Sequence, residues 1–235
     1  MQFGGALQRI LYLIRHANPR YGPCRLAKFD LKDGFYRLFL RALDCLRLAV
    51  LLPKYPGEEQ LIAIPMSCTM GWVELPPSFC VMSETVCDTA NARIEQAGTS
   101  EPPAHRLEPA ASIQDDLARD ITPRAREPEH IEADRALRDL ATPCESPATM
   151  EEVAPPSNKP LSKPLGSSDI FVDDFILLGQ GGPRRMRNIR RHLLMAIDDV
   201  LSQPATGKKH RKEAVLLKKL LQGNGSWATR KVILG

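Results

Sequence analysis

The sequence predicts an α+β fold, an antiparallel sheet with two helices on one face, interrupted by a long disordered insertion. Three features of the chain support this prediction. Residues 170–178 place two adjacent carboxylates between runs of β-type apolar residues, which is the pattern of a strand–turn–strand hairpin. Apolar residues recur every three to four positions in residues 78–96 and 184–201, as in amphipathic helices. Residues 97–168 contain many prolines and acids but no aromatic residue.

The composition indicates a globular protein with an uneven distribution of charge. The chain has 235 residues, of which 43% are hydrophobic, and a formal net charge of +4. Residues 95–169 contain 15 acids and 8 basic residues, whereas residues 184–235 contain 13 basic residues and 3 acids. We therefore expect the C-terminal part to contact a nucleic-acid backbone.

Cysteine spacing and apolar runs bear on the cellular compartment. The six cysteines include no C-x-x-C pair and no histidine at zinc-finger spacing, which favours reduced structural thiols over a metal site. Arg9 and Arg15 interrupt the N-terminal apolar run, and residues 46–52 are too few to span a bilayer. We expect no secretion and no membrane partner, and a location in the cytoplasm or nucleus, or within a particle assembled there.

The first third of the chain is expected to contain a helix, a strand and a hairpin. Apolar positions at helical spacing predict a helix over residues 6–15. Residues 27–36 contain a short apolar strand closed by Asp30, followed by a turn into an amphipathic helix. Residues 40–66 alternate apolar runs around a Pro-Lys-Tyr-Pro-Gly turn, which predicts two paired strands.

The two later helices should bury one face each. In residues 78–96 the apolar positions are Phe79, Met82, Val86, Ala90 and Ile94. In residues 184–201 they are Met186, Ile189, Leu193, Leu194, Ile197 and Leu201. Five arginines occupy the first two turns of this second helix, where positive charge opposes the helix dipole. Either an anionic partner or acids of the insertion neutralise them, or the helix is a solvated surface element.

The insertion between these helices is expected to be disordered. Eleven of the 20 prolines lie between residues 95 and 169, among acids, serines and alanines. Such a segment buries too little apolar surface to offset the entropy lost on ordering, although a short helix around residues 130–140 fits the pattern.

The carboxylates of the hairpin carry the candidate chemistry. Asp173 and Asp174 would lie at its tip, because buried, unpaired carboxylates are costly. With Asp30 brought in from the earlier strand, they would form an oxygen cage suited to Mg²⁺.

This set of residues resembles the palm of reverse transcriptases, the RNA-directed DNA polymerases of retroelements. Asp30 comes first, a glycine loop with Gly71, Trp72, Pro76 and Phe79 follows, and the Asp-Asp hairpin comes last. The resemblance implies a polymerase palm-type antiparallel sheet. Residues 1–96 would hold partial fingers and the first part of the palm, 97–168 the insertion, and 169–235 the second part of the palm with the basic C-terminal region.

The resemblance also implies the catalytic centre. Asp30, Asp173 and Asp174 would be catalytic and, with the backbone carbonyl of Leu31, would hold two Mg²⁺ ions, with Mn²⁺ as an alternative. The reaction would be attack of a primer 3′-hydroxyl on a deoxynucleoside triphosphate. Asp174 would support the other two aspartates rather than bind both ions.

Substrate contacts follow from the same resemblance. Phe35, five positions beyond Asp30, would exclude a 2′-hydroxyl. The alternative is that Phe35, Tyr36 and Phe39 form the apolar face of a helix, and for Tyr36 and Phe39 we favour this alternative. Gly71 would approach the nucleotide. A lysine of the C-terminal region, Lys218 or else Lys219, would protonate the leaving pyrophosphate. Met70 and Leu75 depart from the family pattern in the glycine loop.

The expected partners are an RNA template, a DNA primer, deoxynucleoside triphosphates and other parts of a retroelement polyprotein. Only 29 residues precede Asp30, so most of the fingers would be missing, and Arg9, Arg15 and Arg20 are poor substitutes. The alternative function is an inactive, truncated retroelement remnant with at most nucleic-acid binding.

Overall fold

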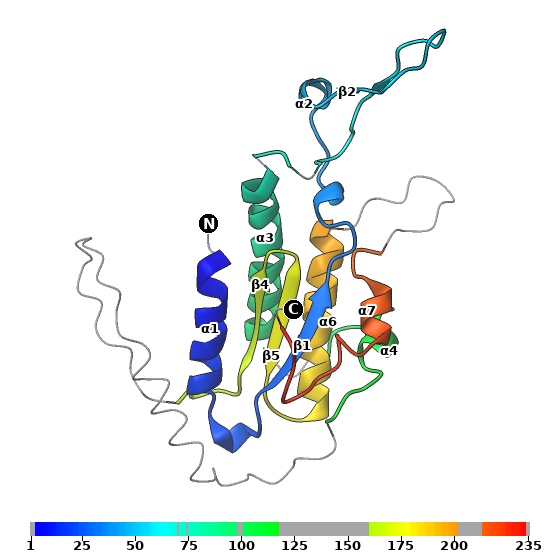
Figure 1. Ribbon diagram of the computed structural model, residues 1–235. Coiled ribbons are helices and arrows are strands. Elements are labelled where there is room, and N and C mark those ends of the chain that lie inside the picture. Colours follow the sequence, from blue (N-terminus) through cyan, green and yellow to red (C-terminus); the bar gives the residue numbers. More distant parts are fainter. Residues whose placement is uncertain are drawn as a thin grey trace, which may run out of the picture.

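A three-stranded antiparallel sheet in the order β1-β5-β4 lies at the centre of the computed structural model (Figure 1). The strands are β1 (Arg25–Asp30), β4 (Gly166–Phe171) and β5 (Asp174–Gly179). The structure describes residues 3–69, 71–73, 75–97, 101–117, 160–201 and 213–233. The predicted α+β class is confirmed, and so is the hairpin, since β4 and β5 are joined by a two-residue turn.

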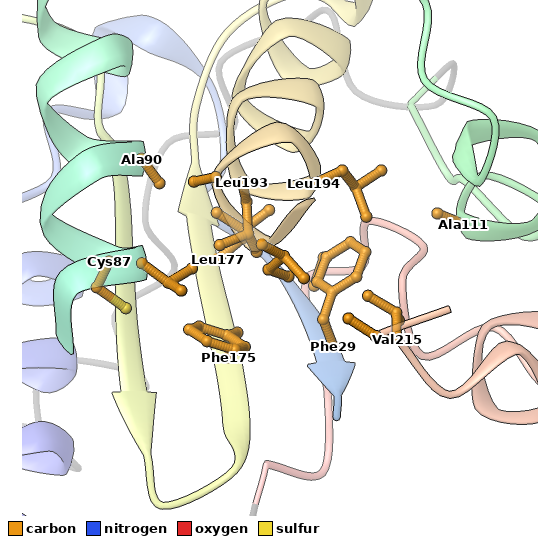
Figure 2. Packing of buried hydrophobic residues seen from close by; sticks show 14 of the residues in the cluster. Phe29, Cys87, Ala90, Ala111, Phe175, Leu177, Leu193, Leu194 and Val215 are labelled. Atoms are coloured by element: carbon orange, nitrogen blue, oxygen red, sulfur yellow. The ribbon is translucent and has the colours of Figure 1, made fainter. Parts of the chain in front are cut away.

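Two long helices cover one face of this sheet. They are α3 (Leu75–Gln96) and α6 (Pro183–Leu201), close to the ranges that periodicity predicts. All six predicted apolar positions of α6 are buried. Figure 2 shows side chains of both helices with those of the sheet in one cluster, among them Cys87, Ala90, Leu193, Leu194, Phe29, Phe175 and Leu177. Burial of each large apolar side chain stabilises the fold by about 1.5–3 kcal/mol.

The opposite face of the sheet is covered in part by α1 (Phe3–His16), where the sequence predicts a helix. Ile10 of α1 packs in a smaller cluster with Leu26, Ile176 and Leu178. Arg9 of α1 also forms two hydrogen bonds, of 2.9 and 2.7 Å, to the Asp169 carboxylate of β4. Alternation along each strand therefore separates a face covered by α3 and α6 from a face covered in part by α1. Asp30 and Asp174 point to the second face.

Residues 40–66 form a small unit beside the main body rather than part of its sheet. It contains α2 (Ala42–Arg47) and a separate two-stranded sheet of β2 (Val50–Leu51) and β3 (Ile62–Ala63). The predicted pairing is confirmed, but residues 42–47 are helical, and the unit extends away from the body in Figure 1. Both strands are exposed.

The helix expected after Asp30 is a single 3₁₀ turn, η2 (Phe35–Arg37). Of the three aromatic residues in this segment, Phe35 turns inward, where its ring packs against Phe79 with centroids 4.5 Å apart. Tyr36 and Phe39 are 46% and 66% exposed, so the expectation that they line a buried helix face is wrong. One turn is too short to bury three aromatic rings on one side.

Part of the expected insertion is ordered. Residues 101–117 include α4 (Glu108–Ala111), and Leu107 and Ala111 are buried in the main core. The expectation of disorder is therefore wrong for these residues, because their acids pair with arginines of α6 in addition to the apolar burial. The expected short helix around residues 130–140 lies outside the described residues. Two further short elements are η1 (Pro19–Tyr21) and α7 (Leu217–Leu221).

Acids elsewhere in the chain lie beside several arginines of α6. The Glu101 carboxylate lies 2.8 Å from Arg191, 3.3 Å from Arg184 and 3.8 Å from Arg187. Arg191 also contacts Glu108 at 2.8 Å. Acids of the expected insertion therefore offset the charge that opposes the helix dipole, which is the first of the two alternatives.

Candidate active site

The register of the sheet brings the aspartates of two distant segments together. Asp30, the last residue of β1, is paired with Asp174, the first residue of β5. Asp173 precedes it at the tip of the hairpin, and its carbonyl accepts a hydrogen bond from the Leu31 N–H at 3.3 Å. The three catalytic candidates and the Leu31 backbone thus lie at one end of the sheet.

The hairpin turn holds Asp173 at an exposed position through an unusual backbone conformation. The central residues are Val172 and Asp173, and only Val172 has a positive φ, of 60°. Positive φ at the first central position alone is typical of a type II′ turn, in which glycine is the usual residue. A β-branched residue in this region is strained by about 1–3 kcal/mol.

Lys28 lies in the same cluster, although the sequence analysis did not single it out. It precedes Asp30 by two positions on β1, so both side chains point to the same face of the sheet. Its ammonium lies 2.7 Å from Asp174 Oδ2 and 3.7 Å from Asp30 Oδ1, and donates to the Ile233 carbonyl at 3.0 Å. The spacing of two in a strand is the sequence signal that places Lys28 on the same face as Asp30.

Two residues of the C-terminal region complete the surroundings of Asp30. Asn224 Nδ2 donates to Asp30 Oδ2 at 2.8 Å, and Lys219 Nζ lies 3.9 Å from Asp30 Oδ1. The Asp30 carbonyl accepts a hydrogen bond from the Leu216 N–H at 2.9 Å. Both candidate lysines are exposed, and the structure brings the ammonium of Lys219 within ion-pair distance of Asp30.

The site has more negative than positive charge. Burial raises the pKa of Asp174; Lys28 opposes this shift, whereas Asp30 and Asp173 add to it. The net direction is upward, so the Lys28 ammonium does not offset burial and two neighbouring carboxylates. A further cation would relieve this repulsion.

The residues fit a divalent cation by chemistry and charge. Carboxylate and carbonyl oxygens are the ligands that Mg²⁺ prefers, and Asp30, Asp174 and Asp173 supply them around an excess of negative charge. Within the described residues, no group of three or more acids, histidines or cysteines is arranged as a metal site. The Lys28 ammonium lies within ion-pair distance of two of the carboxylates.

The other predicted site residues lie in the segments that lead away from β1 and towards α3. Phe35 is half-buried against Phe79 and the core. Gly71 has a φ of 96° and open space where a Cβ would stand, in agreement with the tight turn expected there. Met70 lies outside the described residues, and Leu75 is the buried first residue of α3, with Pro76 in its first turn.

Comparisons with known proteins give no family for this chain. Neither protein-family models, nor curated proteins, nor solved structures match it. Among the described helices, none is long and apolar enough to cross a membrane.

Proposed function

We propose that the chain is a nucleotidyl-transfer palm, an RNA-directed DNA polymerase domain of a retroelement. The observation that carries this proposal is the pairing of Asp30 with Asp174 across β1 and β5, with Asp173 beside them at the hairpin tip. Three acids from segments more than 140 residues apart in the chain meet at one end of a helix-backed antiparallel sheet. The partners are an RNA template, a DNA primer and deoxynucleoside triphosphates.

The residues divide the work of the proposed reaction according to their surroundings. Asp30, Asp173 and Asp174, with the Leu31 carbonyl, would hold Mg²⁺, which lowers the pKa of the primer hydroxyl and neutralises charge on the triphosphate. Asp173 is exposed at the tip, where a substrate could reach it. Asn224 orients the Asp30 carboxylate through its 2.8 Å hydrogen bond.

Two further side chains have supporting roles in this proposal. Lys219, 3.9 Å from Asp30, is the lysine best placed to protonate the leaving pyrophosphate. Phe35 is held by Phe79, and this contact would fix its ring as a barrier to a 2′-hydroxyl.

A second candidate function is favoured by the ion pair of Lys28. In this alternative the site is a catalytically silent palm, in which Lys28 satisfies Asp30 and Asp174 and no metal binds. The α6 arginines, paired with Glu101, would then contribute little to nucleic-acid binding.

Primer extension distinguishes the two candidates. The full chain is incubated with an RNA template, a DNA primer, deoxynucleoside triphosphates and Mg²⁺, alongside Asp173→Asn. The polymerase proposal expects extension by the wild-type chain and a loss of at least about a hundredfold in the variant, because a metal ligand is removed. Asp116→Asn, a change of the same charge at an exposed position, should retain activity. Equal activity of wild type and Asp173→Asn would refute the proposal.

A further inference from the structure

Lys28 is a buried cation at the centre of the candidate site. Its side chain is 11% exposed, and those of Asp30 and Asp174 are 13% and 19% exposed. The three side chains are therefore largely shielded from water, and opposite charges interact more strongly there than at a surface. Removal of one partner from such a pair leaves an uncompensated charge, so the ammonium is an integral part of the site.

The ammonium lies where a cation bound by both carboxylates would lie. It is in direct contact with Asp174 Oδ2 at 2.7 Å and within ion-pair distance of Asp30 Oδ1 at 3.7 Å. A backbone carbonyl, that of Ile233, supplies a third oxygen at 3.0 Å. Two carboxylates and a carbonyl around one positive charge are the same kinds of oxygen ligand that a hard divalent cation takes.

We propose that the Lys28 ammonium holds the place of a divalent cation between Asp30 and Asp174, so that metal ion and lysine compete for these carboxylates. This inference rests on the proposed function, since it concerns the same acidic site. It assigns Lys28 a positioning role: the lysine keeps the two carboxylates together in the metal-free protein and sets the metal concentration at which they are released. The flexible four-carbon stem of lysine allows the ammonium to leave without a backbone change.

Metal titration of the full chain tests this competition without any measurement of activity. Free Mn²⁺ is followed by electron paramagnetic resonance in the presence of wild type, Lys28→Met and Lys32→Met. Lys28→Met should bind Mn²⁺ about tenfold more tightly than wild type or better, because a charge close to both ligands is removed. Lys32→Met is the matched control, since Lys32 is exposed and lies two residues beyond Asp30. Equal Mn²⁺ affinity in all three proteins would overturn the proposal.

A second arm covers the outcome in which Lys28→Met does not fold because two buried carboxylates repel each other. The proposal then expects Mn²⁺ to restore the circular dichroism of the folded protein, and failure to restore it overturns the proposal. Lys28→Arg retains a cation and should bind Mn²⁺ as weakly as wild type. Adding Asp174→Asn to Lys28→Met should abolish the gain, and a gain that persists would place the metal elsewhere.

The same proteins separate this inference from the proposed function. Tighter Mn²⁺ binding by Lys28→Met without primer extension by any variant would support the competition and reject the polymerase. Extension by wild type with unchanged Mn²⁺ affinity in Lys28→Met would support the polymerase and reject the competition.

Discussion

Arg190 of α6 and Asp115 form a bidentate ion pair inside the core, with Nη1–Oδ1 and Nη2–Oδ2 distances of 2.9 and 2.7 Å. The Arg190 side chain is 1% exposed. Arg190 also donates to the Ala111 and Gly225 carbonyls, at 3.1 and 3.3 Å, and Asp115 Oδ1 accepts from the Trp227 N–H at 2.9 Å. One ion pair thus joins α6, the segment around α4 and the C-terminal segment.

Asp115→Asn is expected to destabilise the fold by about 3–5 kcal/mol, because it leaves the buried Arg190 guanidinium without a counter-ion. Chemical denaturation followed by circular dichroism measures this difference. Asp116→Asn removes the same charge from the neighbouring exposed position and should change stability by about 0.5 kcal/mol or less. Similar stabilities of the two variants would show that the ion pair is not a main tie between these segments.

The elements that the sequence predicts correctly are those that periodicity determines. The apolar residues of α6 at helical spacing and the alternating apolar residues of the β4–β5 hairpin are buried. Such spacing can be recognised in the sequence without knowledge of which elements pack against it. The approach of Asp30 to Asp174 is of another kind: periodicity does not determine which strands pair, so the expectation rests on the resemblance, and the register of β1 and β5 places the two residues opposite each other.

Residues 101–117 could not be assigned a structure from composition because long-range ion pairs hold them. Arg106 pairs with Asp198 of α6 and with Glu213. Burial acts to raise the pKa of Asp198, but hydrogen bonds from Arg106 and His105 outweigh it, so this pKa is well below its usual value. Composition counts acids and prolines in one segment but carries no information about the arginines that face them. For Lys28, the period-two spacing places its side chain on the same face of β1 as Asp30, but its contact with Asp174 depends on the pairing of β1 with β5, which spacing along one strand does not determine.

Glu101→Gln is expected to strengthen binding of single-stranded RNA at low salt. Its carboxylate neutralises part of the arginine charge at the start of α6, and the variant releases Arg187 and one side of Arg191. Each arginine that gains a phosphate should steepen the slope of log affinity against log salt by about 0.7. Fluorescence anisotropy of a labelled RNA over a salt series measures this. Glu95→Gln, an exposed change of the same charge, is the control, and equal slopes for both would contradict the prediction.

Lys231 should make the fold more stable as pH rises through the weakly alkaline range. Burial lowers the pKa of its ammonium from the usual 10.5 to about 8, although the ammonium donates to the Gly223 and Ser226 carbonyls at 2.7 and 2.6 Å. Below about pH 8 the lysine is charged in both the folded and the unfolded chain, and the folded state bears the cost of burying that charge. Between about 8 and 10.5 the folded chain releases a proton that the unfolded chain keeps, so stability rises.

The comparison that isolates Lys231 is the unfolding free energy of wild type minus that of Lys231→Met, measured at pH 7 and at pH 9.5 in reducing buffer. This difference should move in favour of wild type at the higher pH. The exposed Lys32→Met controls for the loss of a lysine charge. A difference that stays constant, or moves the other way, would mean that Lys231 is not desolvated.

Val172→Gly should be more stable than Val172→Ala by about 1 kcal/mol, because only glycine adopts a positive φ without strain. Val172 has a φ of 60° at the first position of the β4–β5 turn, directly before Asp173. Both variants lose the valine methyl groups, so their difference reports the backbone and not the lost contacts, apart from the greater entropy of glycine in the unfolded chain. Urea denaturation of the pair measures it. If the alanine variant is equal to or more stable than the glycine variant, the turn is not strained, and the position of Asp173 at the tip does not depend on a costly backbone conformation.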